Sequence, residues 1–171
     1  MTDKQQLIQL PDGSRAALEV AALLDQPFAV TLLIYFGFSA DALDSLFDRS
    51  IFRETLTNPA EFINCELRDE FLCRMPWSRK RRLCEQVGEI LSHRRGALDE
   101  AAGFFCRAHR YGDARICYVQ AAKEACHSGE YTRAFSLLRR AIEIWPAGED
   151  TEKRTHSLPK SRPLPCANPY R

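Results

Sequence analysis

The apolar residues of the first fifty positions recur at helical spacing and are separated by turn-forming residues. The sequence Pro-Asp-Gly-Ser at 11–14 is typical of a turn, and Ser14 is placed to cap a predicted helix over residues 15–24. A second apolar run, residues 28–36, is too short for its periodicity to distinguish a buried strand from a short buried helix. Ser39 is placed to cap a further amphipathic helix. The inner face of that helix carries Leu43, Leu46 and Phe47, and its outer face carries Asp41, Asp44 and Asp48.

Residues 50–64 have the pattern of an antiparallel ribbon. Apolar positions stand on both sides of a turn at Thr57-Asn58-Pro59, with Ile51, Phe52 and Leu56 before it and Phe62 and Ile63 after it. A helix is then predicted from about Glu66 to Arg74, ending before Pro76 because the residue before a proline disfavours helical geometry.

Two more amphipathic helices are predicted between residues 78 and 110. The first begins at Ser78, ends at Gly96 and carries an apolar stripe of Leu83, Val87, Ile90 and Leu91. The second spans residues 98–110 and turns Ala101, Ala102, Phe105 and Ala108 inward. A turn at Tyr111-Gly112-Asp113 is predicted to follow.

Small and large residues recur at fixed intervals in residues 114–146. Counted back about 34 positions from Pro146, the landmarks fall on Tyr118, Ala121, Ala122, Ala125, Ala134, Leu138 and Ala141. This is the pattern of a tetratricopeptide unit, whose small residues allow two helices to approach closely. Gly129 is predicted to end the first helix, because glycine adopts the left-handed conformation without penalty. Such a unit stacks and binds, and it supplies no catalytic chemistry.

These patterns predict a mostly α-helical fold with four regions. Residues 1–9 form a flexible amino terminus, residues 10–75 a small domain and residues 76–146 a helical-repeat segment. Residues 147–171 contain four prolines, at 159, 163, 165 and 169, and almost no large apolar side chains. Such a segment cannot bury enough surface to offset its ordering entropy, so a disordered tail is expected.

The charge distribution is asymmetric although the net charge is only +1. Residues 1–65 carry four basic and nine acidic side chains, net −5, and residues 66–171 carry twenty and fourteen, net +6. The apolar fraction of 45% is enough to supply a core. The sequence has no 18-residue apolar run and no basic-then-apolar signal at its start, so a cytoplasmic protein that does not enter membranes is expected.

The residues that could carry chemistry do not form a recognisable site. The seven cysteines are scattered, which is typical of buried thiols in a cytosolic chain. Cys106 and His109 would share one helix face, but no second pair completes a set of four metal ligands. No nucleophile–base motif and no G-x-x-x-x-G-K-[ST] occurs. We therefore expect no catalytic residue, metal, cofactor or small-molecule substrate.

Two surfaces are candidates for binding a protein partner. The final helix, from Glu130 to Trp145, carries more apolar side chains than a face in water should: Tyr131, Phe135, Leu138, Ile142 and Trp145. These residues predict contact with a second copy of the chain or with another protein. The basic run Arg79, Lys80, Arg81 and Arg82 is either a solvated helix start or a contact for an acidic partner. The acidic amino-terminal part of the same chain is the nearest such partner.

Several short motifs, in their order, resemble those of a known family. They are LPDGSR (10–15), LE (18–19), AALL (21–24), INCELRD (63–69), PWSRKRRL (76–83), FCRA (105–108) and GDA (112–114). Over about residues 10–146 the chain resembles bacterial STAND-class signalling ATPases and transcriptional regulators, in the segment where a winged-helix domain leads into helical repeats. The resemblance implies a winged-helix-like domain over 10–75 and tetratricopeptide-like hairpins over 76–146.

The chain also departs from that family. Asn64 and Cys84 stand where the family pattern usually has histidines, and the nucleotide-binding motif is absent, so ATP hydrolysis is not expected. The resemblance implies a non-enzymatic protein-interaction or regulatory module, which in a STAND-type parent holds the ATPase shut or relays a signal to it. The alternative is a small winged-helix DNA-binding regulator. The aspartates at 41, 44 and 48 argue against nucleic acid, because they would face phosphates.

Overall fold

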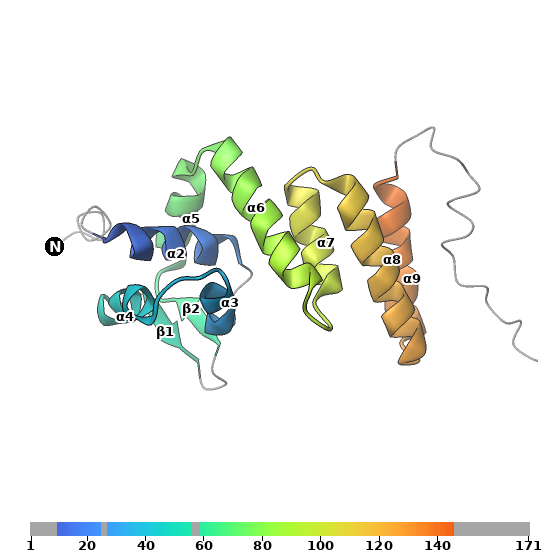
Figure 1. The fold of residues 1–171 in the computed structure, drawn as a ribbon, viewed down its shortest axis with the longest axis horizontal. Helices are drawn as coiled ribbons and strands as arrows, with labels where there is room; N and C mark the ends of the chain where they lie inside the picture. The colour runs from blue at the N-terminus through green and yellow to red at the C-terminus, as the bar shows by residue number, and fades with distance from the viewer. Residues whose placement is uncertain (1–9, 25–26, 56–58, 146–171) are drawn as a thin grey trace, which may run out of the picture.

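The computed structural model describes residues 10–24, 27–55 and 59–145, and their fold is mostly helical (Figure 1). The expectations for residues 1–9 and for the tail lie outside these residues. At one end of the molecule, α2 to α5 surround a two-stranded sheet, and α6 to α9 follow one another toward the other end. The described residues form one hydrophobic core that extends through both parts.

Within the described residues, the first part contains three helices before the sheet. They are α2 (Asp12–Leu23), α3 (Val30–Tyr35) and α4 (Ala40–Asp48). The apolar run at 28–36 contains both an extended residue and a short helix. Phe28 makes an isolated antiparallel bridge to Ala60, and the helix α3 begins at Val30. Phe28, Leu32 and Leu33 of this run are buried, whereas Ile34 and Tyr35 are exposed.

The predicted ribbon is present as β1 (Phe52–Glu54) paired antiparallel with β2 (Ala60–Phe62). Phe52 lies opposite Phe62, and their ring centroids are 4.9 Å apart in an edge-to-face arrangement. The rings of Phe28 and Phe47 also meet Phe52 edge-on, at 5.3 and 5.8 Å. Edge-to-face packing is the favoured aromatic geometry, so this cluster fixes the register of the short sheet.

The predicted cap at Ser14 is wrong. Helix α2 begins at Asp12, with Pro11 in the capping position, and the amide of Arg15 donates to the carbonyl of Pro11 over 2.9 Å. Proline is suited to a helix start because its fixed φ and missing N–H cost nothing there. Ser14 is therefore inside the first turn and fully buried, and its hydroxyl has no hydrogen-bond partner among the described residues.

Two other helices begin at side-chain caps. Ser39 accepts a hydrogen bond from the amide of Ala42 at the start of α4, as predicted. Asn64 accepts from the amides of Glu66 and Leu67, at 2.9 and 3.3 Å, at the start of α5 (Cys65–Arg74). An asparagine satisfies these amides well, because it is among the residues most favoured at a helix start.

The carboxyl end of α2 is held by arginines from two distant helices. Arg68 of α5 donates to the carbonyls of Ala22 and Leu24, at 3.0 and 3.2 Å. Arg107 of α7 donates to the carbonyl of Leu23 between them, at 3.1 Å. Three successive carbonyls at a helix end, which a helix cannot satisfy internally, are thus bonded by cationic side chains. The Arg68 bonds hold α5 to α2 within the first part, and the Arg107 bond joins that part to the helical array.

The second part consists of four helices, each packed on the next: α6 (Trp77–Ser92), α7 (Leu98–Arg107), α8 (Tyr111–His127) and α9 (Tyr131–Glu143). Gly96 and Gly129 in the connections both have φ of +78°, which glycine adopts without strain. The predicted turn at Tyr111-Gly112-Asp113 is wrong, because these residues form the first turn of α8. The preceding helix ends earlier, at Arg107, and His109 reverses the chain with φ of +59°.

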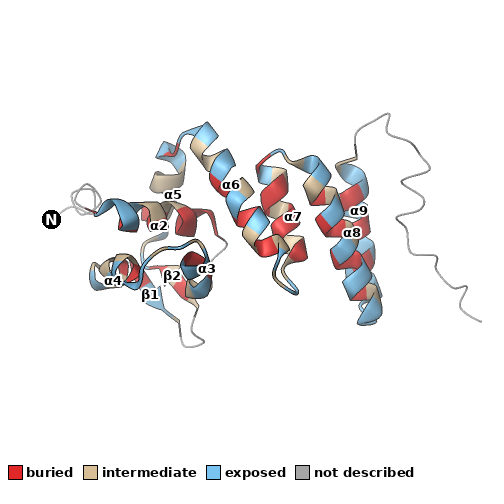
Figure 2. Ribbon diagram, viewed as in Figure 1, coloured by how far each residue is buried: buried red, intermediate tan, exposed pale blue. Residues whose placement is uncertain are grey.

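The small and large landmark residues of the last hairpin lie on the packed faces of α8 and α9. All seven, namely Tyr118, Ala121, Ala122, Ala125, Ala134, Leu138 and Ala141, are buried. Figure 2 shows these buried stretches facing one another along the array, with exposed residues on the outer faces. The alanines leave room for close helix approach, which is what the spacing predicted.

Candidate interaction surfaces

Helix α9 carries an exposed apolar stripe, consisting of Tyr131, Phe135 and Ile142. These side chains are 71%, 72% and 42% exposed. Their spacing of four and seven residues places them within about 40° of one another around the helix axis. The three side chains therefore share one side of α9.

Two of the five residues predicted for this surface lie elsewhere. Leu138 is only 7% exposed and belongs to the face of α9 that packs on α8, together with Ala134 and Ala141. Trp145 is half-buried, and the guanidinium carbon of Arg115 lies 4.8 Å from the centroid of its ring. The prediction included too many residues, because the sequence pattern does not show which side chains of α9 pack on α8.

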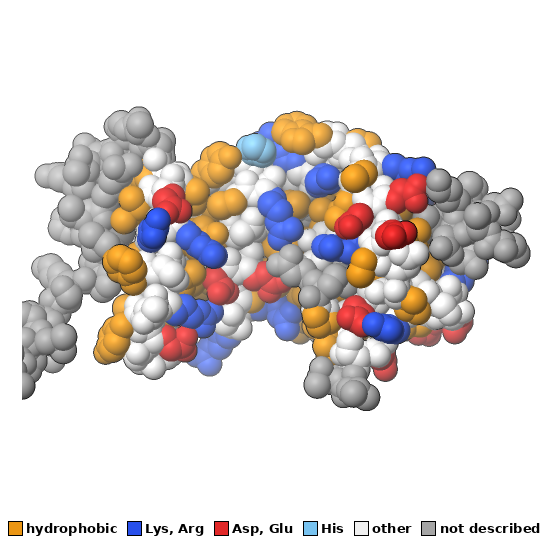
Figure 3. All heavy atoms as spheres, turned by 180° about the vertical axis from the view of Figure 1, so that it is seen from behind, with side chains coloured by type: hydrophobic (Ala, Val, Ile, Leu, Met, Phe, Trp, Pro, Cys, Tyr) orange, Lys and Arg blue, Asp and Glu red, His pale blue; other side chains and the backbone are white. Residues whose placement is uncertain are grey.

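The charged side chains of α9 near the stripe are paired within the molecule. Arg139 donates to Glu143 over 2.9 Å, one turn along the helix. Arg133 bonds Glu130 at 3.2 Å and Asp99 of α7 at 2.9 Å. In the view from behind, hydrophobic side chains lie beside charged ones of both signs at the α8–α9 end (Figure 3). The apolar stripe at this end is therefore flanked by charged side chains that form ion pairs with one another.

The basic run Arg79–Arg82 does not form one surface. Consecutive helix residues point about 100° apart, so four successive side chains face different directions. Arg79 bonds Glu19 of α2 through Nε at 2.8 Å and through its terminal nitrogen at 2.7 Å. Arg81 donates to the carbonyl of Ala108 over 2.8 Å, and its guanidinium lies 5.4 Å from the ring centroid of Trp77. Lys80 is half-buried beside them.

Arg82 differs from the other two arginines of that run. It is exposed, and its side chain has no hydrogen bond, ion pair or ring contact to any residue that the structure describes. Arg79 contacts the acidic part of the same chain, as the sequence suggested for the run as a whole. Among the four basic residues, Arg82 presents the guanidinium that is available to a ligand.

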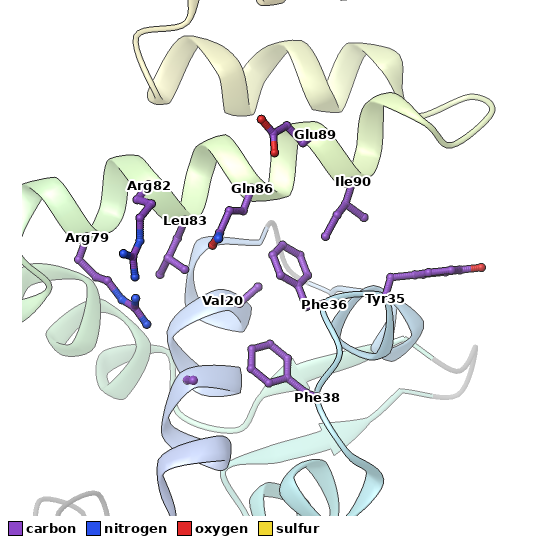
Figure 4. A pocket seen from close by; sticks show the side chains of 11 residues that line it. Val20, Tyr35, Phe36, Phe38, Arg79, Arg82, Leu83, Gln86, Glu89 and Ile90 are labelled. Atoms are coloured by element: carbon purple, nitrogen blue, oxygen red, sulfur yellow. The ribbon is translucent and has the colours of Figure 1, made fainter.

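Arg82 stands beside a groove between the two parts of the molecule (Figure 4). The groove has a volume of about 400 Å³. It is lined from α2 by Ala16 and Val20, and from the end of α3 and the segment after it by Tyr35, Phe36 and Phe38. The lining from α6 consists of Arg79, Arg82, Leu83, Gln86, Glu89 and Ile90. Nothing in the sequence pattern indicated this groove, because its walls come from three separated segments.

A second hollow, of about 670 Å³, lies between α3, α4 and β1. Its floor is apolar, and its edge carries the exposed carboxylates of Asp44, Asp48 and Glu54. These three have no ion pair to any described residue. The outer face of α4 is therefore acidic, as its sequence predicted.

The cysteines within the described residues do not form a reactive centre. Burial raises the pKa of the Cys84, Cys106 and Cys117 thiols, which keeps them protonated at neutral pH. His109 does not share a helix face with Cys106, because α7 has already ended; its ring nitrogen is 3.1 Å from the hydroxyl of Tyr111. No three metal-ligating side chains gather anywhere in the described part of the chain.

Comparison with known proteins gives no relative: no family model, no curated protein and no solved structure matches this chain. None of the helices in the described ranges is long and apolar enough to cross a bilayer.

Proposed function

We propose that this chain is a non-enzymatic protein-interaction module, and that the apolar stripe of α9 is its contact surface. The observation that carries the proposal is the exposure of Tyr131 and Phe135, each above 70%, on one strip of a helix. Large aromatic side chains kept in water cost free energy that burial against a partner recovers. Aromatic residues are also the ones that most often anchor protein interfaces.

The spacing of the helices supports a tetratricopeptide-like array. Trp77 and Tyr111, which begin α6 and α8, are 34 positions apart, and Leu98 and Tyr131, which begin α7 and α9, are 33 apart. A tetratricopeptide unit has a period of about 34 residues. At offsets of 33 or 34 residues, small buried residues take equivalent positions in the two hairpins: Gly88 and Ala122, Ala101 and Ala134, and Ala108 and Ala141.

The first part supports a winged-helix-like unit. Three helices precede a two-stranded antiparallel ribbon, and the bridge from Phe28 to Ala60 adds a third short segment beside the ribbon. A winged helix has this order of helices and strands. Together with the resemblance to STAND-class proteins, this order supports a regulatory role in which the module relays an interaction made by its helical array.

The partner that fits the stripe best is a second copy of this chain. The charged side chains beside it, Glu130, Arg133, Arg139 and Glu143, are paired within the molecule, so the stripe does not demand a partner of opposite charge. Two identical neutral faces related by a two-fold axis can meet without opposing like charges. A stripe from residue 131 to 142 is also about 16 Å long, enough for two helices to pack along it.

Sedimentation equilibrium of the full chain between about 5 and 200 µM tests the proposal. We expect the wild type to dimerise, and Tyr131→Glu with Phe135→Glu to raise the dimer dissociation constant at least tenfold. Helix content by circular dichroism should stay unchanged, because both side chains are exposed in the monomer.

The matched control is Thr132→Glu with Ser136→Glu, which places the same two charges on another exposed side of α9. This variant should dimerise like the wild type. A wild-type chain that stays monomeric over the whole range, or equal weakening by both double variants, would show that the stripe does not bind a second copy.

A further inference from the structure

We propose that the groove between α2, α3 and α6 is a binding site for a small amphiphilic anion, a molecule with an apolar ring or acyl body and a carboxylate, sulfonate or phosphate head. The proposal concerns a different surface from the α9 stripe and does not depend on it. It rests on the lining of the groove, on two polar side chains without partners, and on its size.

The floor of the groove is apolar and aromatic. Figure 4 shows the rings of Phe36 and Phe38 reaching toward Val20 of α2, with Ile90 and Leu83 above them on α6. The two phenyl rings are nearly parallel, with centroids 6.2 Å apart and 16° between their planes. An apolar body placed here would cover aromatic surface that stays half-buried in the free protein.

The head group would be met by Arg82 and Gln86. Both side chains extend from α6 toward the groove in Figure 4, and neither has a hydrogen bond or ion pair to a described residue. They stand four residues apart on one helix face, so they can reach the same ligand. A guanidinium and an amide together donate well to a carboxylate, sulfonate or phosphate.

Other charged side chains also stand around the groove. Arg79 is bonded to Glu19, so this pair adds no net charge. Glu89, at the opposite end, lies 3.7 Å from Arg110, but Arg110 also pairs with Glu85 and Asp113, so Glu89 keeps much of its charge. The end of the groove at Arg82 therefore favours an anionic head group, and the end at Glu89 disfavours one.

The size of the groove indicates a small molecule rather than a protein segment. Its volume of about 400 Å³ lies within the usual range for ligand pockets, about 300–1,000 Å³. A docked helix is about 10 Å across and needs a longer trough. A ligand here would touch both α2 and α6, and it would therefore stabilise the contact between the two parts of the molecule.

Fluorescence titration of the full chain with 8-anilinonaphthalene-1-sulfonate, an aromatic sulfonate that brightens in apolar sites, tests the proposal. We expect saturable binding of one molecule per chain at micromolar concentrations. Arg82→Gln should weaken binding at least threefold and Arg82→Glu at least tenfold. Decanoate should displace the probe, whereas decyltrimethylammonium, with the same chain and the opposite charge, should not.

Three controls locate the probe. Arg95→Gln removes the charge of an exposed arginine outside the groove and should leave the affinity unchanged. Gln86→Trp should fill the groove and abolish binding while helix content is retained. The association variant Tyr131→Glu with Phe135→Glu should bind like the wild type.

Absence of saturable binding below about 1 mM would overturn the proposal. So would an Arg82→Gln variant that binds as well as Arg95→Gln, or loss of binding in the α9 variant alone, since these results would place the probe elsewhere. Because the dimer is measured separately, failure of this site leaves the interaction proposal intact.

Discussion

At the scale of single residues, two serines near helix starts have opposite effects on stability. Ser39 caps α4, because its hydroxyl oxygen accepts a hydrogen bond of 3.3 Å from the amide of Ala42. Ser14 is buried in the first turn of α2 with no partner for its hydroxyl among the described residues. A buried hydroxyl that has lost its bonds to water reduces stability, whereas a cap adds to it.

Replacing each serine by alanine should therefore change stability in opposite directions. Ser39→Ala should lower the free energy of unfolding by about 1 kcal/mol, because the amide of Ala42 loses its acceptor. Ser14→Ala should leave that free energy unchanged or raise it by up to about 1 kcal/mol. Urea denaturation followed by circular dichroism measures both. A loss of about 1 kcal/mol for Ser14→Ala would mean that Ser14 caps the helix after all.

These residues also show how far the sequence predicts local structure. Ser14 and Ser39 both precede an apolar-periodic stretch, and only the backbone shows that Pro11 takes the capping position in one case. Cap motifs identify the neighbourhood of a helix start but not which polar residue is used. Asn64 is the converse case, a cap that was noticed only as a departure from a family pattern.

At the scale of elements, the α6–α7 contact depends on one glycine. A Cβ atom added to Gly88 would lie 3.0 Å from two ring carbons of Phe105, which is itself buried. Gly103 of α7 is also helical, but an added Cβ there would meet nothing within 4 Å. The first glycine is needed for close packing, and the second only costs backbone entropy.

Alanine substitutions at the two positions form a matched pair. Gly103→Ala should raise the free energy of unfolding by about 0.5–1 kcal/mol through helix propensity. Gly88→Ala makes the same gain but must displace Phe105, so it should be less stable than Gly103→Ala by about 1–3 kcal/mol. Thermal and urea denaturation measure the difference. Equal stabilisation by both would show that α7 yields easily and that the contact is loose.

The elements themselves were largely predictable, and their edges less so. The periodicity of Leu83, Val87 and Leu91 indicated α6 correctly, since one helix face is buried. The run at 28–36 could not be assigned, because it is short and changes from an extended bridge at Phe28 to a helix at Val30, so no single period runs through it. Leu138 fitted both the packed face and the free face by spacing, and only the position of α8 places it in the packed one.

At the scale of the whole molecule, the separation of charge bears on DNA binding. The outer face of α4 carries Asp41, Asp44 and Asp48, and no basic residue lies within this helix. Phosphate contacts supply most of the affinity of DNA-binding proteins, and this face repels phosphates. The winged-helix resemblance alone therefore does not make this chain a DNA-binding protein.

Duplex DNA should bind with a dissociation constant weaker than about 10 µM at ~150 mM salt, which is the non-specific range. Asp44→Lys with Asp48→Lys should strengthen binding at least tenfold if α4 is the face nearest the duplex. Asp69→Lys with Glu124→Lys makes the same change in charge elsewhere and should strengthen it less. Fluorescence anisotropy measures all three proteins. Nanomolar, sequence-dependent binding by the wild type would instead favour a DNA-binding regulator.

The groove and the α9 stripe differ in how visible they were from sequence. The stripe was foreseen, apart from its edges, because it lies on one helix. The groove joins Val20, Phe36 and Arg82, and no pattern within one segment reveals that such residues meet. A site formed between helices depends on how the helices pack together, and the hydrophobic periodicity of each helix does not show this.

The arginine bonds at the end of α2 also have a consequence for the order of assembly. Arg68, which bonds the carbonyls of Ala22 and Leu24, follows them by 46 and 44 residues. Arg107, which bonds the carbonyl of Leu23, follows it by 84 residues. During synthesis, α2 is the first of the described helices to be made, yet the carbonyl of Leu23 stays hydrated until Arg107 of α7 has emerged from the ribosome. Closing an 84-residue loop costs chain entropy and slows this step. The helix made first is therefore completed only after α3 to α6 and the sheet have been made.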